Sequence, residues 1–415
     1  MNTKKLFNRD FTMVVIGQII SLFGNAIIRF ALPLYLLNQT GSAALFGIVS
    51  ACSFIPMIIL SPIGGIFADR VNKRNIMVIL DFSTAALITV FTLLFGHVDV
   101  VFLILVTLVI LYAIAGAYQP AVQASLPVLA SETNLMPANA VINLVSSLAG
   151  LVGPVIGGAL YGFYGLKPLL YIGIACFFVS AVMEIFIHIP FQKMPAEASI
   201  IKTVKGDLKE SFRFIIKEHP ALAKGVWIVA AINLFLSSLM IIGLPVIVTQ
   251  VLGFAEQQGN QLYGYSQGAL AAGSLLGGLL AGVLSQKLKV KSAYKLLFFS
   301  AAALIPMGVS LLLGAPAMTS YLIIVVCCFV MMVMASIFNI LMLSYVQRVT
   351  PTHLVGKIIS CIMAISMCAS PLGQALYGWL FQAFEGYEYA IMLACAAVST
   401  GIALYSRKAF HAVEE

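Results

Sequence analysis

The sequence predicts an all-α polytopic protein, one that crosses a membrane many times. Hydrophobic residues make up 61% of the 415 residues and charged residues only 9%, whereas a typical soluble domain carries about 25% charged residues. Apolar stretches of about 20 residues, long enough for a helix to cross a bilayer, follow one another along the chain. Residues 101–112 are apolar on every face, whereas the strands of a membrane barrel would alternate. Helices are therefore the expected spanning structure.

Twelve apolar segments separated by short polar breaks are the predicted membrane spans. The first follows a basic N-terminus and is expected to remain in the protein, because no signal-peptide cleavage site follows a short apolar core. The predicted spans cover residues 12–37, 44–68, 75–96, 99–119, 138–162, 167–188, 221–250, 262–286, 293–313, 319–345, 356–381 and 387–406.

The placement of lysine and arginine predicts the orientation. When alternate loops are assigned to alternate sides, all but two of the 23 basic residues fall on one side. The exceptions are Lys167, in an opposite loop, and Arg29, within a span. Because basic loops stay in the cytoplasm, both termini are expected there. The net charge of +8 is spread between apolar spans, which argues against a nucleic-acid partner.

The longest hydrophilic segment divides the chain into two groups of six spans. We predict an N-terminal six-helix bundle at residues 1–190, a cytoplasmic linker at 191–220 and a C-terminal six-helix bundle at 221–415. Paired six-helix halves are typical of transporters. Apolar residues at helical spacing in the linker predict an amphipathic helix on the cytoplasmic surface, with a plain solvated linker as the alternative. These residues are Val204, Leu208, Phe212 and Ile215.

Residues 65–74, GIFADRVNKR, have a glycine, then three residues, an aspartate, a basic residue and finally a basic pair. This pattern resembles the loop 2-3 motif of the major facilitator superfamily. The resemblance implies a cytoplasmic latch that sets the conformational balance; basic residues placed for topology alone are the alternative. Asn72 stands where the family often has glycine, and Asn tolerates the left-handed conformation that glycine would supply. The latch residues would be Gly65, Asp69, Arg70, Lys73 and Arg74.

The fifth predicted span carries a second match. Its segment GPVIGG at 153–158 resembles a Gly-Pro motif of drug antiporters in that superfamily, although Ala149 stands where the motif has a further glycine. Small residues let helices pack closely in a bilayer, and proline bends a helix. The segment is expected to close the cavity or let it flex, with ordinary helix packing as the alternative. The motif residues are Gly153, Pro154, Gly157 and Gly158.

Segments 120–127 and 135–140 resemble the macrolide-efflux branch of the same superfamily. The resemblance implies proton-coupled efflux of drugs or other amphipathic small molecules by alternating access, from a monomer without cofactors in a bacterial cytoplasmic membrane. A carrier of a lipid, a siderophore or another metabolite with the same fold is the alternative. A membrane-embedded enzyme would need a nucleophile, a metal cluster or paired carboxylates within the spans, and the sequence shows no such set.

Ionisable residues within the spans are costly and are therefore candidates for function. Asp81 and Glu184 lie near the predicted cytoplasmic ends of spans three and six, and by elimination they are the candidates for proton coupling. Arg29 lies deep in span one, on a polar stripe that includes Asn25. We expect Arg29 and Asn25 to face the substrate cavity; a merely structural arginine is the alternative.

Other polar residues deep in the spans are candidates for the cavity wall. Any single one can instead bond a neighbouring helix. With Arg29 as the fixed charge and no central carboxylate, the cavity is expected to suit neutral or anionic amphiphiles. These candidates are Gln119, Gln123, Asn143, Asn233, Ser237, Tyr263, Gln267, Asn339 and Gln374.

Overall fold

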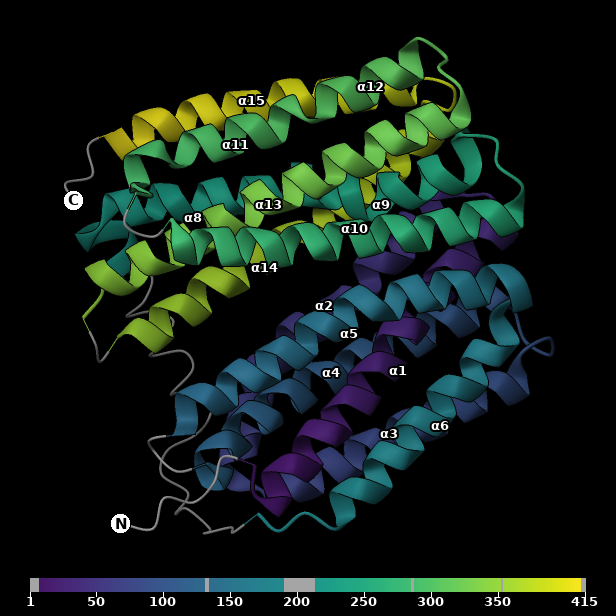
Figure 1. Cartoon of the computed structure of the whole chain (residues 1–415), viewed down its shortest axis with the longest axis vertical. Coiled ribbons are helices and arrows are strands. Elements are labelled where there is room, and N and C mark those ends of the chain that lie inside the picture. Colours follow the sequence, from purple (N-terminus) through teal and green to yellow (C-terminus); the bar gives the residue numbers. More distant parts are fainter. Residues whose placement is uncertain (1–6, 131–133, 190–212, 285–286, 352–353, 412–415) are drawn as a thin grey trace. The chain divides into compact units, whose positions relative to one another are not determined.

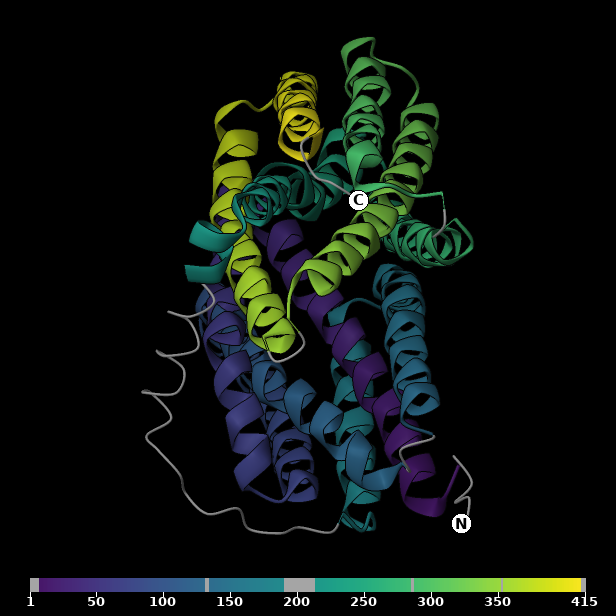
Figure 2. The ribbon, with the colours of Figure 1, turned by 90° about the vertical axis from the view of Figure 1, so that its left-hand side faces the viewer.

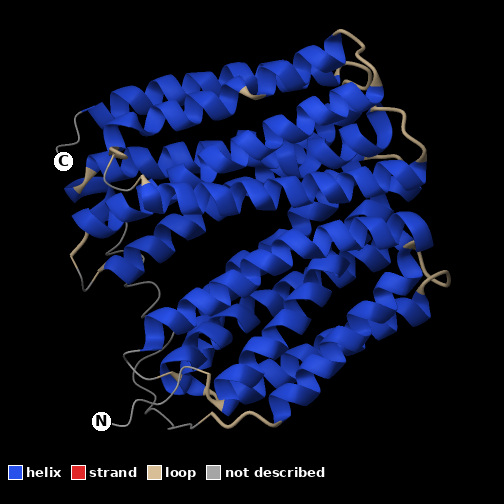
Figure 3. Cartoon of the chain, viewed as in Figure 1, coloured by secondary structure: helices blue, strands red, loops and turns tan. Residues whose placement is uncertain are grey.

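The computed structural model describes residues 7–130, 134–189, 213–284, 287–351 and 354–411. These residues form helices joined by short loops (Figures 1 and 3). Within these ranges, twelve helical segments are long and apolar enough to cross a membrane. The prediction of an all-α protein with twelve spans is confirmed.

The helices of the first six spans follow the predicted order, and one is much longer than expected. The sequence predicts an end near residue 119 for the fourth span, but its helix continues through Pro120 and Pro127. That prediction was wrong, because membrane helices tolerate proline where the freed backbone groups find other partners. The six helices are α1 (Arg9–Thr40), α2 (Ala43–Arg70), α3 (Lys73–Leu94), α4 (Val100–Leu129), α5 (Leu135–Tyr164) and α6 (Leu166–Ile185).

The seventh span alternates between α-helical and π-helical turns. It consists of α8 (Pro220–Ile232), η3 (Asn233–Ser237), α9 (Ser238–Val246) and η4 (Ile247–Val251), and η2 (Phe214–Glu218) precedes it. In the η3 turn, Ser238 Oγ donates a hydrogen bond to the carbonyl of Asn233 at 2.7 Å, and Cys395 Sγ donates one to the carbonyl of Phe235 at 3.6 Å. Side chains therefore donate hydrogen bonds to backbone carbonyls at the π-helical turn, as expected where a helix is locally irregular.

The remaining helices complete the last five spans. The eighth begins at Glu256, six residues before the prediction, because the polar residues at 256–261 continue the helix instead of forming a loop. Of the predicted amphipathic helix, Ile215 lies in η2, and the other three residues lie outside the described ranges. These helices are α10 (Glu256–Val283), η5 (Val290–Ser292), α11 (Ala293–Ala302), α12 (Leu304–Leu312), α13 (Ala317–Val349), α14 (Val355–Ala383) and α15 (Glu388–His411).

Polar side chains cap the N-termini of two helices that carry candidate residues. Asp99 Oδ1 accepts the backbone N–H of Phe102 at 2.9 Å at the start of α4. Asn72 Oδ1 accepts the backbone N–H of Arg74 at 3.0 Å at the start of α3. The backbone of Asn72 is extended, with φ −61° and ψ 116°, and so does not take the left-handed conformation that this residue type tolerates. Asn72 instead caps α3, whose first N–H groups lack partners within the helix.

Contacts between residues divide the chain into two compact units. Unit 1 comprises residues 1–40, 52–197 and 256–268. In it, α1 packs against α5 and α6, and α3 packs against α6 and α4; Figure 1 shows α3 and α6 side by side. α1 therefore has neighbours on several sides, and two of its polar residues, Gln18 and Ser21, are buried.

Unit 2 comprises residues 41–51, 198–255 and 269–415. In it, α15 packs against α11 and α12, and α14 packs against α8, η3 and α9. The turned view shows α15 in yellow beside the green helices α11 and α12 (Figure 2). The predicted domain bounds at residues 190 and 220 stay a prediction.

The orientation in the membrane can be tested by labelling single cysteines. In a background without the seven native cysteines, cysteines at His97 and Gln258 are expected to react with an impermeant maleimide added to whole cells. A cysteine at Lys287 is expected to react only after permeabilisation. All three positions are exposed, so burial cannot explain a missing reaction. The opposite pattern would overturn the orientation drawn from the basic residues.

Candidate functional site

Six polar side chains gather inside unit 1, on helices α1, α3, α4 and α6. None of them is more than 5% exposed. We call this group the carboxyl cluster, because it contains two acids. Its members are Gln18, Ser21, Asp81, Tyr118, Ser180 and Glu184.

A chain of hydrogen bonds crosses the carboxyl cluster. Gln18 Nε2 donates to Tyr118 Oη at 2.7 Å, and Tyr118 Oη donates to Glu184 Oε1 at 2.7 Å. Because the hydroxyl proton of Tyr118 is directed at Glu184, its oxygen must accept from the amide of Gln18. The orientation of the Gln18 amide is therefore set by the carboxyl group of Glu184.

Asp81 joins the same cluster from α3. Ser21 Oγ donates to Asp81 Oδ1 at 3.0 Å, and Asp81 and Glu184 are close enough for their carboxyl groups to interact electrostatically. Tyr118 lies near both acids. The sequence shows no pairing of these acids, which stand 103 positions apart along the chain (184 minus 81). The fold thus creates a carboxyl pair within the spans.

Three buried oxygens of the carboxyl cluster have no hydrogen-bond partner among the described residues. They are Gln18 Oε1, Asp81 Oδ2 and Glu184 Oε2. Buried polar atoms in folded proteins nearly always have a hydrogen-bond partner. A buried polar atom without one lowers the stability of the fold by about 1–3 kcal/mol. Three such acceptors in one cluster can be completed by a proton, a water molecule or a ligand.

Apolar side chains close one end of the carboxyl cluster. They lie where α1 and α3 begin and where α4 and α6 end, and Tyr118 packs directly among them. The acids therefore have no direct path to water at that end in this conformation. This apolar group includes Phe11, Val14, Val15, Met77, Val122, Leu126, Ile187 and Ile189.

Arg29 lies further along α1, against α4. Its guanidinium carbon is 3.9 Å from the centroid of the Tyr112 ring, which is cation–π geometry. Its Nε and Nη2 atoms are buried and have no hydrogen-bond partner among the described residues. These two N–H groups lie on one edge of the guanidinium, the edge that binds both oxygens of a carboxylate. Asn25, one turn earlier, is half-buried.

Two aromatic pairs include Tyr112 itself or Phe30, the residue that follows Arg29 in α1. Phe54 packs edge-on against Tyr112 with 5.6 Å between centroids. Phe30 stacks on Tyr263 at 5.0 Å, and the hydroxyl of Tyr263 accepts a hydrogen bond from Gln267 Nε2 at 2.8 Å. The charged group of Arg29 over the Tyr112 ring suits a ligand with both polar and apolar parts.

The glycines of α5 lie at close helix contacts. A Cβ added at Gly153 would come within 2.4 Å of Ala26 Cβ. One added at Gly158 would come within 2.6 Å of the Gly264 Cα on α10. Gly157 faces Phe30 and Ile27 of α1 in ordinary contact. Pro154 lies between them within the unbroken helix α5.

The described residues show part of the predicted latch. Lys73 and Arg74 begin α3 and are half-buried, and Arg74 Nε is buried without a hydrogen-bond partner among the described residues. Gly65, Asp69 and Arg70 belong to α2, but the side chains of Asp69 and Arg70 and the surroundings of Gly65 lie outside what the structure describes. The latch stays a prediction.

Comparison with known proteins identifies the family. The model of the Major Facilitator Superfamily matches residues 14–374, most of the chain. The chain belongs to this superfamily. It is therefore a multi-pass membrane transporter of a small molecule and not an enzyme, as the sequence predicts.

Two of the relatives are named as efflux proteins. The chain is 24% identical over 377 residues to macrolide efflux protein A of Streptococcus pyogenes, covering 88% of each chain. It is 26% identical over 398 residues to the multidrug efflux pump Tap of Mycolicibacterium fortuitum, covering 92% of this chain and 91% of Tap. The fold is similar to that of the nucleoside transporter NupG, with a TM-score of 0.75 and 15% identity over 98% of this chain and all of NupG.

The other predicted cavity residues of this transporter are scattered over both units. Gln123 and Asn143 in unit 1 and Asn339 in unit 2 are exposed, and Gln119 is half-buried. Asn233 donates to the carbonyl of Val229 on its own helix at 3.2 Å. Gln374 is buried and donates to Ser370, one turn away on its own helix, at 3.0 Å. No contact described here joins them into one wall.

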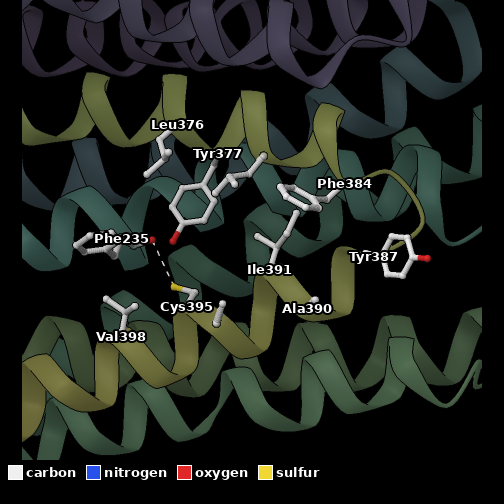
Figure 4. Close-up of a pocket in the computed structure, with 11 residues that line it drawn as sticks. Phe235, Leu376, Tyr377, Phe384, Tyr387, Ala390, Ile391, Cys395 and Val398 are labelled. Atoms are coloured by element: carbon white, nitrogen blue, oxygen red, sulfur yellow. Dashed lines mark hydrogen bonds between the residues drawn. The ribbon is translucent and has the colours of Figure 1, made fainter.

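Two cavities lie in unit 2. One, of about 280 Å³, is lined by apolar and aromatic residues of α14, α15 and η3, with Tyr377 and Cys395 pointing toward each other (Figure 4). The other, of about 300 Å³, lies where the chain enters α2 and leaves η4 and α14, and Glu385 and Glu388 are among its lining residues. Neither contains a residue that the sequence singles out.

The sequence misses the residues that connect the two acids. Tyr118 sits in an apolar stretch of span four, where a tyrosine is unremarkable, and Ser180 sits in a similar stretch of span six. Gln18 and Ser21 have the spacing of one helix face, but that spacing does not say which helix they meet. Only the packing of α1 and of α3 against α4 and α6 brings the six side chains together.

Proposed function

We propose that this transporter exports amphipathic small molecules, drugs among them, across the cytoplasmic membrane of a bacterium in exchange for protons. Alternating access is the expected mechanism. Relatives named as macrolide and multidrug efflux proteins support export, since the chain matches most of the length of each. We also propose that it works as a monomer, because the single chain supplies all twelve spans.

The observation that carries proton exchange is the pair Asp81 and Glu184. Burial disfavours the charged form of a carboxyl group, and a second carboxylate nearby disfavours it further. Neither acid forms an ion pair with a basic residue in the part of the chain that the structure describes. A buried acid pair of this kind is suited to bind a proton in one conformation and release it in another.

The surroundings of Arg29 support an amphipathic substrate. The guanidinium offers two unserved N–H groups, and Tyr112 and Phe54 offer apolar ring surface. A molecule with an electron-rich group next to an apolar body would satisfy both. The chemistry favours a neutral or anionic amphiphile over a strong cation, because Arg29 is a fixed positive charge.

The proposal is tested by accumulation in a bacterial host without its own efflux pumps. Cells that make the protein are expected to accumulate several-fold less of a radiolabelled macrolide, or of another compound from a panel of amphipathic drugs, than cells with the empty vector. A protonophore should remove the difference, since the proton gradient would be gone. If no compound in the panel is affected, the export of drugs is wrong; if the difference survives the protonophore, the coupling to protons is wrong.

A further inference from the structure

The hydrogen bonds of the carboxyl cluster lack donors. Gln18 Nε2, Tyr118 Oη and Ser21 Oγ already direct their protons at Tyr118, Glu184 and Asp81, and Ser180 Oγ donates to the carbonyl of Gly17 at 3.1 Å. The three oxygens without partners are all acceptors when both acids are ionised. A proton on either acid turns one of these acceptors into a donor, and Gln18 Oε1 is an acceptor that such a donor can serve.

Electrostatics limits how the two acids share protons. Asp81 is 2% exposed and Glu184 is fully shielded, so two negative charges here would have little solvation. Removing the first proton from such a pair is far easier than removing the second, as with other carboxyl pairs that share a site. The two acids therefore bind protons as one unit and not as two independent groups.

We propose that Asp81 and Glu184 form a single proton site that takes up and releases one proton in each transport cycle, with Tyr118 and Gln18 as its positioning residues. The proposal rests on the proposed function and deepens it, because it names the site and the number of protons. In the closed conformation described here, the pair shares one proton. When the apolar end of the cluster opens, water solvates both carboxylates and the proton leaves.

Tyr118 holds the two acids together. Its hydroxyl donates to Glu184 and accepts from Gln18, and Asp81 lies close to it as well. A hydroxyl that donates to a carboxylate favours the charged form, so Tyr118 makes the single negative charge of the half-protonated pair tolerable. Gln18 fixes the hydroxyl and leaves its own carbonyl oxygen free for the shared proton.

Among the described side chains of the carboxyl cluster, Asp81, Glu184 and Tyr118 are the ones that titrate. The helix α5, which packs against α1, contains no Asp, Glu, His, Lys or Arg. On the helices of the cluster, the other charged residues lie near the helix ends or, for Arg29, beside Tyr112. The residues near the ends are Arg9, Asp10, Lys73, Arg74 and Lys167.

Proton release from the purified, detergent-solubilised protein tests the single site. Wild type and the double variant Asp81→Asn with Glu184→Gln are titrated across the neutral pH range, and the protons released are counted with a pH indicator. We expect wild type to release one proton more than the double variant. Each single variant should retain one titrating acid. Asp99→Asn, at the exposed start of α4, is the matched control and should shift nothing in this range.

The number of protons that wild type releases beyond the double variant distinguishes a single shared site from two independent sites or none. A difference of two protons would mean two independent sites, and a difference of zero would mean that the pair does not exchange protons; either result overturns the proposal. A titration that moves when sodium chloride replaces choline chloride would show that the cluster binds Na⁺ instead. The titration needs no substrate, so it can succeed even where the export of drugs fails, and the reverse also holds.

Tyr118→Phe tests the positioning role without removing an acid. Loss of the hydroxyl donor is expected to raise the midpoint of proton release by about one to two pH units, because a hydrogen bond to a charged group is worth about 1.5–3 kcal/mol. Tyr171→Phe, on the exposed surface of α6, is the control. An unchanged midpoint in Tyr118→Phe, in a protein that still elutes as a single species, would remove Tyr118 from the site.

Discussion

Replacing Gly158 with leucine is expected to abolish transport and lower the thermal stability of the protein. Even the first atom of a new side chain would lie 2.6 Å from Gly264 Cα and 3.1 Å from the carbonyl of Asn260. These are backbone atoms, so they cannot turn aside as a flexible side chain can. The helices α5 and α10 would have to separate, and overpacking of this kind costs about 1–3 kcal/mol.

Gly150 on the same helix provides a matched control. A Cβ added there meets no atom within 4 Å, so Gly150→Leu is expected to transport normally, and its melting temperature should stay the same or rise, since leucine favours helix more than glycine does. Both variants are compared by uptake into energised membrane vesicles, by abundance and by thermal unfolding in detergent. Equal uptake, abundance and melting temperature in the two variants would show that the α5–α10 contact is needed for neither transport nor stability.

The sequence predicts the spans well because the bilayer imposes one simple requirement. Every spanning segment needs about 20 apolar residues, and that signal can be read from composition alone. The signal fails at the ends, where other forces decide. α4 continues through Pro120 and Pro127, and α10 begins in the polar segment at 256–261. A helix can extend beyond the apolar layer wherever its backbone N–H and C=O groups find hydrogen-bond partners.

The candidate site is harder to predict from the sequence than the fold, since it depends on which helix faces meet. Asp81 and Glu184 stand out in the sequence because charge within a span is rare. Their pairing depends on the packing of α3 against α6, and the bridging residue Tyr118 carries no sequence signal that separates it from any other tyrosine in an apolar run. Asn72 shows the same limit locally: its residue type allows a left-handed turn, and the helix that follows makes it a cap instead.

Arg29→Ala is expected to lose nearly all transport while the protein remains abundant in the membrane. Placing an arginine deep in a span costs about 2.5–3.5 kcal/mol at insertion, so an arginine without a function is hard to retain. Its unserved Nε and Nη2 atoms can bind the electron-rich group of a substrate once the surrounding side chains move during the cycle. Arg29→Lys should keep part of the activity, because it keeps the charge but not the paired N–H groups of the guanidinium.

The alternative is an arginine that only braces α1 against α4 through its contact with Tyr112. Tyr112→Leu distinguishes the two roles of Arg29, since it removes the ring beneath the guanidinium and leaves the charge in place. A bracing arginine predicts that Arg29→Ala and Tyr112→Leu lose abundance to a similar degree, while the surviving molecules transport normally. A substrate-binding arginine predicts that flux per molecule, measured in reconstituted vesicles, falls far more in Arg29→Ala than in Tyr112→Leu. Wild-type flux per molecule in Arg29→Ala would rule out a role for Arg29 in substrate binding.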